Sequence, residues 1–175
     1  GVLVRDVAAL AEHLALEPGG FDLVGFSLGA RTAVHAVAYG ILEPRRLALC
    51  GMGLEGLSDW QRRAAHFTRV IDEFDTIGPG DPGYTARTFL KSQGVDRAAA
   101  RLLLAAMEDF DIARLAGISL PTAVICGDED HDNGSAAALA RHLPDARHVT
   151  VPGGHVNSVT KPELGEAIAA FLAAP

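Results

Sequence analysis

The chain has 175 residues, of which 49% are hydrophobic and 21% are charged. The length fits one domain of ordinary size, and the hydrophobic content excludes a disordered chain. The formal net charge is −7 and the lysines and arginines do not cluster, which argues against a nucleic-acid partner and against binding to an anionic membrane.

Residues 1–51 alternate between helical and strand patterns. In the opening segment, apolar residues recur at the spacing of one helix face, and Pro18-Gly19-Gly20 ends the predicted helix. Residues 21–26 form a short, mostly apolar run of strand length, a helical pattern follows Ser27, and residues 46–51 match a second strand. The order helix, strand, helix, strand indicates parallel strands joined by crossover helices.

Residues 52–119 contain no convincing strand pattern. Apolar residues recur at helical spacing from Trp60 to Phe74, and a loop rich in glycine and proline covers residues 77–83. Helical patterning is strong again over residues 98–107. This segment is predicted to be an all-helical insertion that forms a cap.

Strand and helix patterns alternate again in residues 120–175. Strands are predicted over residues 121–127 and 147–151, and helices over residues 135–143 and 162–172. The predicted fold is therefore α/β, with a mostly parallel sheet, flanking helices and a helical cap insertion. Residues 1–51 and 120–175 would form the α/β core, and residues 52–119 the cap.

The run Gly25-Phe26-Ser27-Leu28-Gly29 joins a predicted strand to the helix that follows it. It matches the nucleophile elbow Gly-x-Ser-x-Gly, a tight and strained turn that lifts a serine above the sheet. Small residues two positions before and after the serine would let strand and helix approach each other, and the Leu28 N–H would face a developing oxyanion. The alternative is a glycine-containing turn with a helix-capping serine.

The elbow and two later motifs resemble the α/β-hydrolase family, in particular its serine esterases and lipases. Residues 23–30, Leu-Val-Gly-Phe-Ser-Leu-Gly-Ala, are similar to that family's elbow almost residue for residue. The family often carries its acid in Gly-x-x-Asp after a later strand and its histidine in a Gly-His near the C-terminus. Gly127–Asp130 and Gly154-His155 match these two motifs, and the order Ser, Asp, His fits the family.

The resemblance implies a catalytic triad with Ser27 as nucleophile and His155 as general base and acid. Asp130 would orient the imidazole and stabilise its cation. Asp130 is preferred because it fills the Gly-x-x-Asp position, while Asp128 remains an alternative. Some members of the family carry the acid one strand earlier, where Glu55 would be the candidate.

No metal or cofactor site is predicted. The acidic run that begins at Asp128 is weakly similar to a calcium-binding loop, but its sixth position is Asn133 instead of glycine and its twelfth is Leu139 instead of glutamate. The histidines at positions 13, 35, 66, 142 and 148 lack metal-ligand spacing. Trp60 is a candidate substrate contact from the cap; the alternative, which helical aromatic residues favour, is packing in the cap's own core.

The resemblance covers only the second half of the family fold, from the helix before the elbow onward. Earlier strands of the family pair with the elbow strand, and one of them is followed by a loop that supplies the second oxyanion donor. Without them, residues 21–26 would be an unpaired apolar edge. We therefore expect the chain to be a fragment, or to be complemented by a missing N-terminal segment of the same protein.

Cys50 and Cys126 each end an apolar run, which favours two buried thiols over a disulfide and fits a reducing cytoplasm. No apolar run approaches the roughly 20 residues that a membrane span needs, and no signal peptide is evident. The protein is expected to be soluble and cytoplasmic.

The expected function is that of a serine hydrolase, which cleaves an ester, lactone or thioester of a small apolar substrate through an acyl-enzyme. Acyl transfer, peroxidation and C–C bond hydrolysis use the same triad and stay open. Dehalogenases and epoxide hydrolases of this fold carry an aspartate where this chain has Ser27. The alternative from another class is a non-catalytic binding or scaffold module on the same fold.

Overall fold

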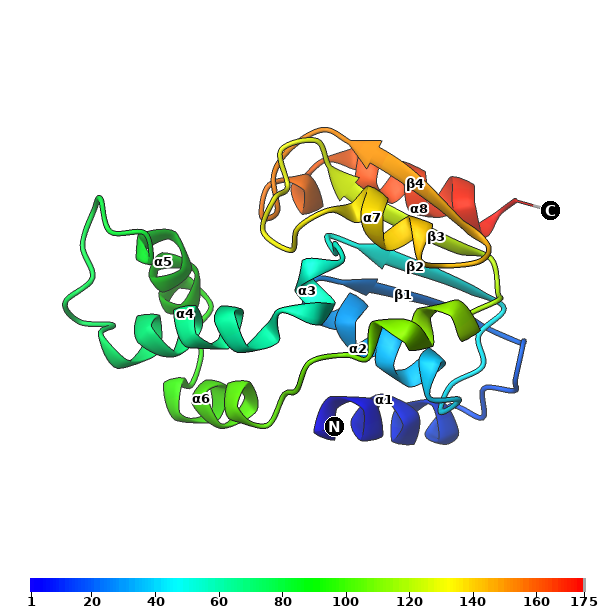
Figure 1. The fold of residues 1–175 in the computed structure, drawn as a ribbon, viewed down its shortest axis with the longest axis horizontal. Helices are drawn as coiled ribbons and strands as arrows, with labels where there is room; N and C mark the ends of the chain where they lie inside the picture. The colour runs from blue at the N-terminus through cyan, green and yellow to red at the C-terminus, as the bar shows by residue number, and fades with distance from the viewer. Residues whose placement is uncertain (175) are drawn as a thin grey trace. The chain divides into compact units, whose positions relative to one another are not determined.

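The computed structural model describes residues 1–174 and contains a parallel four-stranded sheet (Figure 1). Pro175, the last residue of the predicted third segment, lies outside the described residues. The strands are adjacent in chain order: β1 (Asp22–Phe26), β2 (Arg46–Cys50), β3 (Thr122–Gly127) and β4 (Ala146–Val151). All three pairs are parallel, so the carboxyl ends of the strands meet at one edge of the sheet.

The helices that accompany the sheet belong to the first and last parts of the chain. They are α1 (Val2–His13), α2 (Leu28–Ala38), α3 (Glu55–Ser58), α7 (Ala136–Arg141) and α8 (Pro162–Leu172), with the 3-10 turns η1 (Ile112–Gly117) and η2 (Ser158–Thr160). These helices and strands confirm the predicted fold class. The alternation of strand and helix produces it, because parallel strands need a crossover between them.

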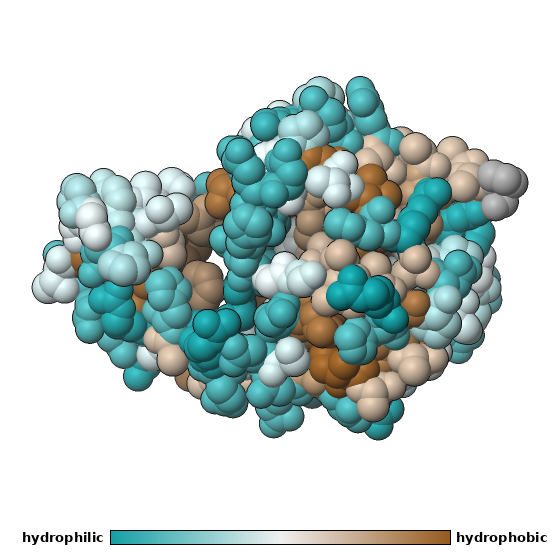
Figure 2. All heavy atoms as spheres, turned by 45° about the horizontal axis from the view of Figure 1, so that its top comes forward, coloured by the Kyte–Doolittle hydropathy of each residue, from teal (hydrophilic) through white to brown (hydrophobic). Residues whose placement is uncertain are grey.

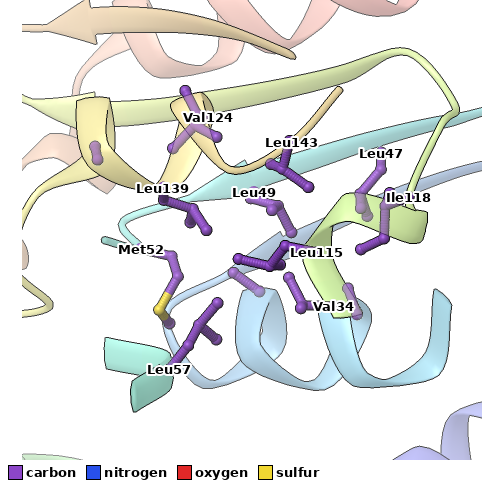
Figure 3. Close-up of a cluster of buried hydrophobic side chains, with 14 of the residues drawn as sticks. Val34, Leu47, Leu49, Met52, Leu57, Leu115, Ile118, Val124, Leu139 and Leu143 are labelled. Carbon is purple, nitrogen blue, oxygen red and sulfur yellow. The ribbon is translucent and has the colours of Figure 1, made fainter. Parts of the chain in front are cut away.

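The sheet is covered on both faces because side chains alternate between the faces along each strand. Leu49 of β2 and Val124 of β3 point to the face covered by α2 and α7. Cys50 and Ile125, one position further on, point to the face covered by α8. Figure 3 shows the first of these clusters, in which side chains from α2, β2, β3 and α7 converge.

Residues 59–109 form a second compact unit, made of α4 (Trp60–Asp72), α5 (Tyr84–Ser92) and α6 (Arg97–Ala105). Charged side chains join its helices and loops. Arg101 of α6 pairs with Asp72 of α4 at 2.7 Å, and Arg69 of α4 pairs with Asp81 of the following loop at 2.6 Å. We refer to residues 59–109 as the helical unit, and to residues 1–58 and 110–174 as the sheet unit.

The helical unit is shorter than the predicted cap of residues 52–119. Leu57, Leu115 and Ile118 are completely or almost completely buried in the core of the sheet unit. Helical spacing in the sequence does not tell which core an apolar face will join, so the predicted boundaries differ from the observed ones. The Phe110 N–H donates to the Leu57 carbonyl at 3.0 Å, so the chain leaves and re-enters the sheet unit at neighbouring points.

Strand β1 forms one edge of the sheet among the described residues, and Val24 on this strand is 43% exposed. Other large apolar side chains also reach the surface, and Figure 2 shows hydrophobic patches between hydrophilic residues on the face that it draws. No helix within residues 1–174 is both long and apolar enough to cross a membrane.

Candidate active site

Ser27 lies on a tight turn between the end of β1 and the start of α2. Its backbone φ is +51° and its ψ is −113°, a strained conformation for a residue with a side chain. The Ser27 N–H donates to the Cys50 carbonyl at 2.8 Å, which extends the pairing of β1 and β2 to the turn itself. The serine is therefore held at the carboxyl edge of the sheet.

The two glycines of the elbow motif differ in the space that a side chain would have. A Cβ at Gly25 would lie 2.5 Å from the Gly29 carbonyl group and 2.6 Å from the Ala30 nitrogen, so only glycine fits there. A Cβ at Gly29 would meet nothing within 4 Å. The expectation of a small residue on both sides of Ser27 therefore holds at Gly25 and is wrong at Gly29, because the close approach involves the backbone of Gly29 and leaves its side-chain position open.

Helix α2 places backbone N–H groups next to Ser27. Leu28 is the first residue of this helix, so its N–H has no carbonyl acceptor within the helix. One turn further on, the buried guanidinium of Arg31 donates to the carbonyls of Gly56 and Leu57 at 2.7 and 3.2 Å. These bonds fix the start of α2 against the segment that contains α3.

Ser27, His155 and Asp130 form a continuous chain of side-chain contacts. The Ser27 Oγ lies 2.8 Å from Nε2 of His155, and Nδ1 of His155 lies 2.9 Å from Oδ2 of Asp130. His155 and Asp130 come from the loops after β4 and β3, which the parallel sheet brings to the same edge as the elbow. The side chain of His155 is 15% exposed and that of Asp130 only 2% exposed, so the acid is the more deeply buried of the two.

The environment of Asp130 keeps its carboxylate charged. Burial raises the pKa of Asp130, but the hydrogen bond and charge of His155 and the Asp132 N–H outweigh it and hold the pKa below its ordinary value. An ionised carboxylate can only accept hydrogen bonds. Nδ1 of His155 therefore donates to Asp130, and Nε2 faces the Ser27 hydroxyl.

Two further residues confine the His155 ring, and sequence reasoning did not identify them. The Phe26 ring lies 5.1 Å from the His155 ring, centre to centre. Gly51 has a φ of +59°, and a Cβ there would lie 2.7 Å from the Phe26 ring and 3.2 Å from Cε1 of His155. In the sequence, the only sign of this role is that Gly51 comes directly after a predicted strand. The sequence does not indicate which ring would be crowded by a side chain at this position.

The alternative acids have other partners. Asp128 Oδ1 accepts the Gly153 N–H at 2.7 Å, and Glu55 Oε2 accepts the Ser135 N–H at the start of α7 at 2.7 Å. In the same loop, the buried side chain of Asn133 donates to the Gly51 carbonyl at 2.6 Å. In the run that resembles a calcium loop, Asp128 and Asn133 thus form hydrogen bonds to neighbouring segments of the chain. Residues 1–174 contain no group of three or more potential metal ligands.

Trp60 belongs to the helical unit, where it is 7% exposed and its Nε1 donates to the Leu104 carbonyl at 3.3 Å. It also lines a hollow of about 630 Å³ within that unit, together with Thr68, Met107 and the Arg101–Asp72 pair. These contacts are those expected if Trp60 packs in the core of the helical unit. Contact of Trp60 with a substrate stays a prediction.

Comparison with known proteins identifies relatives for nearly the whole chain. The family model described as "Alpha/beta hydrolase family" matches residues 2–168. A hydrolase from Pseudomonas aeruginosa PA01 is 25% identical with a TM-score of 0.69, and the match covers 98% of this chain and 71% of that one. No curated protein sequence matches the chain.

Two other solved structures carry more specific names. A thermophilic esterase from Thermogutta terrifontis is 25% identical with a TM-score of 0.73, over 97% of this chain and 70% of that one. An enol-lactonase from Burkholderia xenovorans LB400 is 19% identical with a TM-score of 0.66, over 98% of this chain and 72% of that one, and this likeness concerns the fold alone. Since the family model spans residues 2–168, the chain belongs to the alpha/beta hydrolase family.

Proposed function

We propose that this protein is a serine hydrolase that cleaves an ester, lactone or thioester of a small apolar substrate through an acyl-enzyme. The observation that carries the proposal is the contact chain from Ser27 Oγ through His155 to Asp130, with distances of 2.8 and 2.9 Å. Family membership and the esterase among the structural relatives support the same class of reaction.

The proposed reaction assigns each proton to a defined atom. His155 Nε2 accepts the Ser27 proton while Oγ attacks the carbonyl carbon, and Asp130 stabilises the resulting imidazolium. The tetrahedral intermediate collapses as His155 returns the proton to the leaving alcohol or thiol. His155 then deprotonates a water molecule, which attacks the acyl-enzyme, and His155 returns this proton to the Ser27 Oγ as the acyl–oxygen bond breaks and the carboxylic acid leaves.

The Leu28 N–H is the proposed donor to the oxyanion of the tetrahedral intermediate. It follows Ser27 directly and lies at the N-terminus of α2, where the helix dipole also favours negative charge. The apolar character of the substrate is supported by exposed side chains beside the two reacting residues. Leu28 follows Ser27, Val156 follows His155, and both side chains are exposed to solvent.

A second oxyanion donor is proposed to come from an N-terminal segment that pairs with β1. The support is that β1 is an edge strand with an exposed Val24. Expression with the upstream coding sequence would test it. Slower hydrogen exchange of β1 amides and a gain in rate of roughly 10²–10³ are expected, the latter because one oxyanion donor contributes about that much; unchanged exchange would contradict the pairing.

Fluorophosphonate labelling tests the proposed hydrolase. The wild-type chain is expected to take up one probe molecule at Ser27, and the Ser27→Ala variant none. Ser119→Ala is the matched control, because Ser119 is an exposed serine of the sheet unit and its loss should leave labelling unchanged. A folded wild-type protein that takes up no probe would contradict the proposal and favour a non-catalytic binding module.

The class of substrate needs a separate measurement. A panel of p-nitrophenyl esters of increasing acyl length, with a thioester and a lactone of matched size, would be compared by kcat/KM. Activity on short apolar acyl groups is expected. Turnover of none of these substrates by a chain that the fluorophosphonate labels would contradict the substrate class while leaving the nucleophile in place.

We also propose a cytoplasmic location. Cys50 and Cys126 are buried and unpaired, and burial raises the pKa of the two thiols to about 12 and about 11. Neither thiol is suited to disulfide exchange, which requires a thiolate. Cell fractionation would test the location, and recovery of the protein only outside the cytoplasm would contradict it.

A further inference from the structure

The loops that carry Asp130 and His155 continue the pairing of β3 and β4 beyond the ends of the strands. The last paired residues are Gly127 and Val151. Beyond them, the Asp128 N–H donates to the Val151 carbonyl at 2.8 Å, and the Glu129 N–H donates to the Gly153 carbonyl at 3.1 Å. The acid and the histidine therefore lie on two loops that are bonded to each other upstream of both side chains.

One bond in this extended ladder is supplied by a side chain. The Gly153 N–H lies between the two backbone bonds, and it donates to Oδ1 of Asp128 at 2.7 Å. In a parallel ladder this N–H would find a carbonyl of the neighbouring strand. Here the neighbouring chain turns back, with the Asp130 N–H donating to the Gly127 carbonyl at 3.1 Å, and the carboxylate of Asp128 takes the acceptor's place.

The fit between the two loops leaves little freedom. Gly153 has a φ of +111°, and a Cβ at Gly127 would lie 1.8 Å from the Gly153 carbonyl oxygen. The next N–H, that of Gly154, donates to Oδ1 of Asn157 at 2.7 Å. The N–H groups of the two residues before His155 are thus both bound by side-chain oxygens. The carboxylate of Asp128 is the stronger acceptor because it is charged, and it belongs to the loop that carries Asp130.

We infer that Asp128 is a positioning residue that keeps the His155 loop in register with Asp130. Asp128 acts through the Gly153 backbone, two residues before His155, and lies two residues before Asp130 itself. Its carboxylate therefore couples the positions of both partners of the 2.9 Å contact. The inference rests on the proposed hydrolase function, where a displacement of about 1 Å can cost about 100-fold in rate.

Three variants separate the acceptor from its charge. Asp128→Ala removes the acceptor, Asp128→Asn keeps an oxygen at the same place without the charge, and Asp128→Glu keeps the charge but moves the oxygen by one methylene. We expect kcat for p-nitrophenyl acetate to fall about 10-fold to 100-fold in Asp128→Ala and Asp128→Glu, and less than about 3-fold in Asp128→Asn. KM should change by less than about 2-fold, because the role inferred for Asp128 involves no contact with the substrate.

Glu129→Ala is the matched control, since Glu129 is the next residue of the loop and its exposed side chain can be removed while its backbone hydrogen bond is kept. This variant should keep the wild-type kcat. The inference is wrong if Asp128→Ala keeps the wild-type kcat, or if Asp128→Asn loses as much activity as Asp128→Ala. Should Asp128→Ala fail to fold, the contrast between Asp128→Asn and Asp128→Glu decides.

Proton NMR of the His155 ring provides a readout that does not depend on turnover. In the wild type, the Nδ1 proton held by Asp130 should give a resolved downfield signal. Asp128→Ala and Asp128→Glu should broaden or remove this signal, and Asp128→Asn should retain it. If the wild type is inactive but the signals behave in this way, the hydrolase proposal fails while the positioning role stands; identical signals in all variants overturn the positioning role.

Discussion

The sheet unit buries apolar side chains on both faces of its sheet, whereas the buried apolar side chains of residues 59–109 are confined to α4 and the loop that follows it. Helices α5 and α6 contain no buried residue. The guanidiniums of Arg87 and Arg97 lie 5.3 and 4.8 Å from the centre of the Phe74 ring, and Arg101 pairs with Asp72 between α6 and α4. Exposed ion pairs contribute little, about 0–1 kcal/mol each, so the sheet unit should be much the more resistant to local unfolding.

This difference corresponds to a division of roles. Ser27, Asp130 and His155 all lie in the sheet unit, at the end of strands whose neighbours are packed on both faces. Groups that must keep contacts of 2.8 and 2.9 Å benefit from such a support. A weakly packed helical unit can adapt its conformation at smaller cost.

The largest expected effect concerns the charge of Asp130. Asp130→Asn should lower kcat about 10⁴-fold with little change in KM, because the amide no longer holds the His155 tautomer that accepts the Ser27 proton. Steady-state kinetics with p-nitrophenyl acetate measures it. Asp6→Asn, at an exposed position of α1, is the control, and a loss of less than about 10-fold in Asp130→Asn would show that His155 does not depend on this carboxylate.

The next effect compares a buried leucine of the sheet unit with an exposed leucine of the helical unit. Leu139 of α7 is 0% exposed and Leu102 of α6 is 73% exposed. Leu139→Ala should lower the free energy of unfolding by about 2–5 kcal/mol, because it leaves a cavity in the sheet unit, while Leu102→Ala should change it by less than about 0.5 kcal/mol. Urea denaturation measures both, and equal losses would mean that Leu102 is packed as closely as Leu139.

These contrasts indicate what the sequence can and cannot predict. The strands follow from apolar runs such as residues 122–127, all of which are buried, and the elbow follows from a local motif. The bounds of the helical unit cannot be predicted in this way. Leu57 and Leu115 lie in the core of the sheet unit, but their spacing in the sequence would be the same if they lay in the core of the helical unit. The roles of Gly51 and Asp128 depend on residues that only the folded sheet brings beside them, here His155 and Gly153.

A smaller effect would test how closely the His155 ring is confined. Gly51→Ala and Gly40→Ala both place a side chain at positive φ, +59° and +65°, and each should cost about 1–2 kcal/mol of stability. Only Gly51→Ala also crowds Phe26 and His155, since nothing lies within 4 Å of a Cβ at Gly40. Gly51→Ala should therefore lower kcat by at least about 10-fold and Gly40→Ala should not. Equal kcat values would contradict the confinement.

The smallest effect arises from a titratable group on the apolar side of α2. Burial, together with the charges of Arg31 and the N-terminus, lowers the pKa of His35 to about 4. Between the ordinary pKa of about 6.5 and this value, the unfolded chain binds a proton that the folded chain resists, so stability falls as the pH falls. His35→Gln should lose less stability than the wild type between pH 7 and pH 5, as measured by urea midpoints. Parallel losses would contradict the neutral, packed state of His35 against Phe110.

The hydrogen bond between the Phe110 N–H and the Leu57 carbonyl has a consequence for variation among related proteins and for engineering. Because the excursion of residues 59–109 begins and ends at neighbouring points, a loop of a few residues could bridge the gap without disturbing any strand. Insertions of other lengths and compositions could be grafted at the same junction. Residues 59–109 could thus be replaced by another segment while the strands and loops that hold Ser27, Asp130 and His155 are kept.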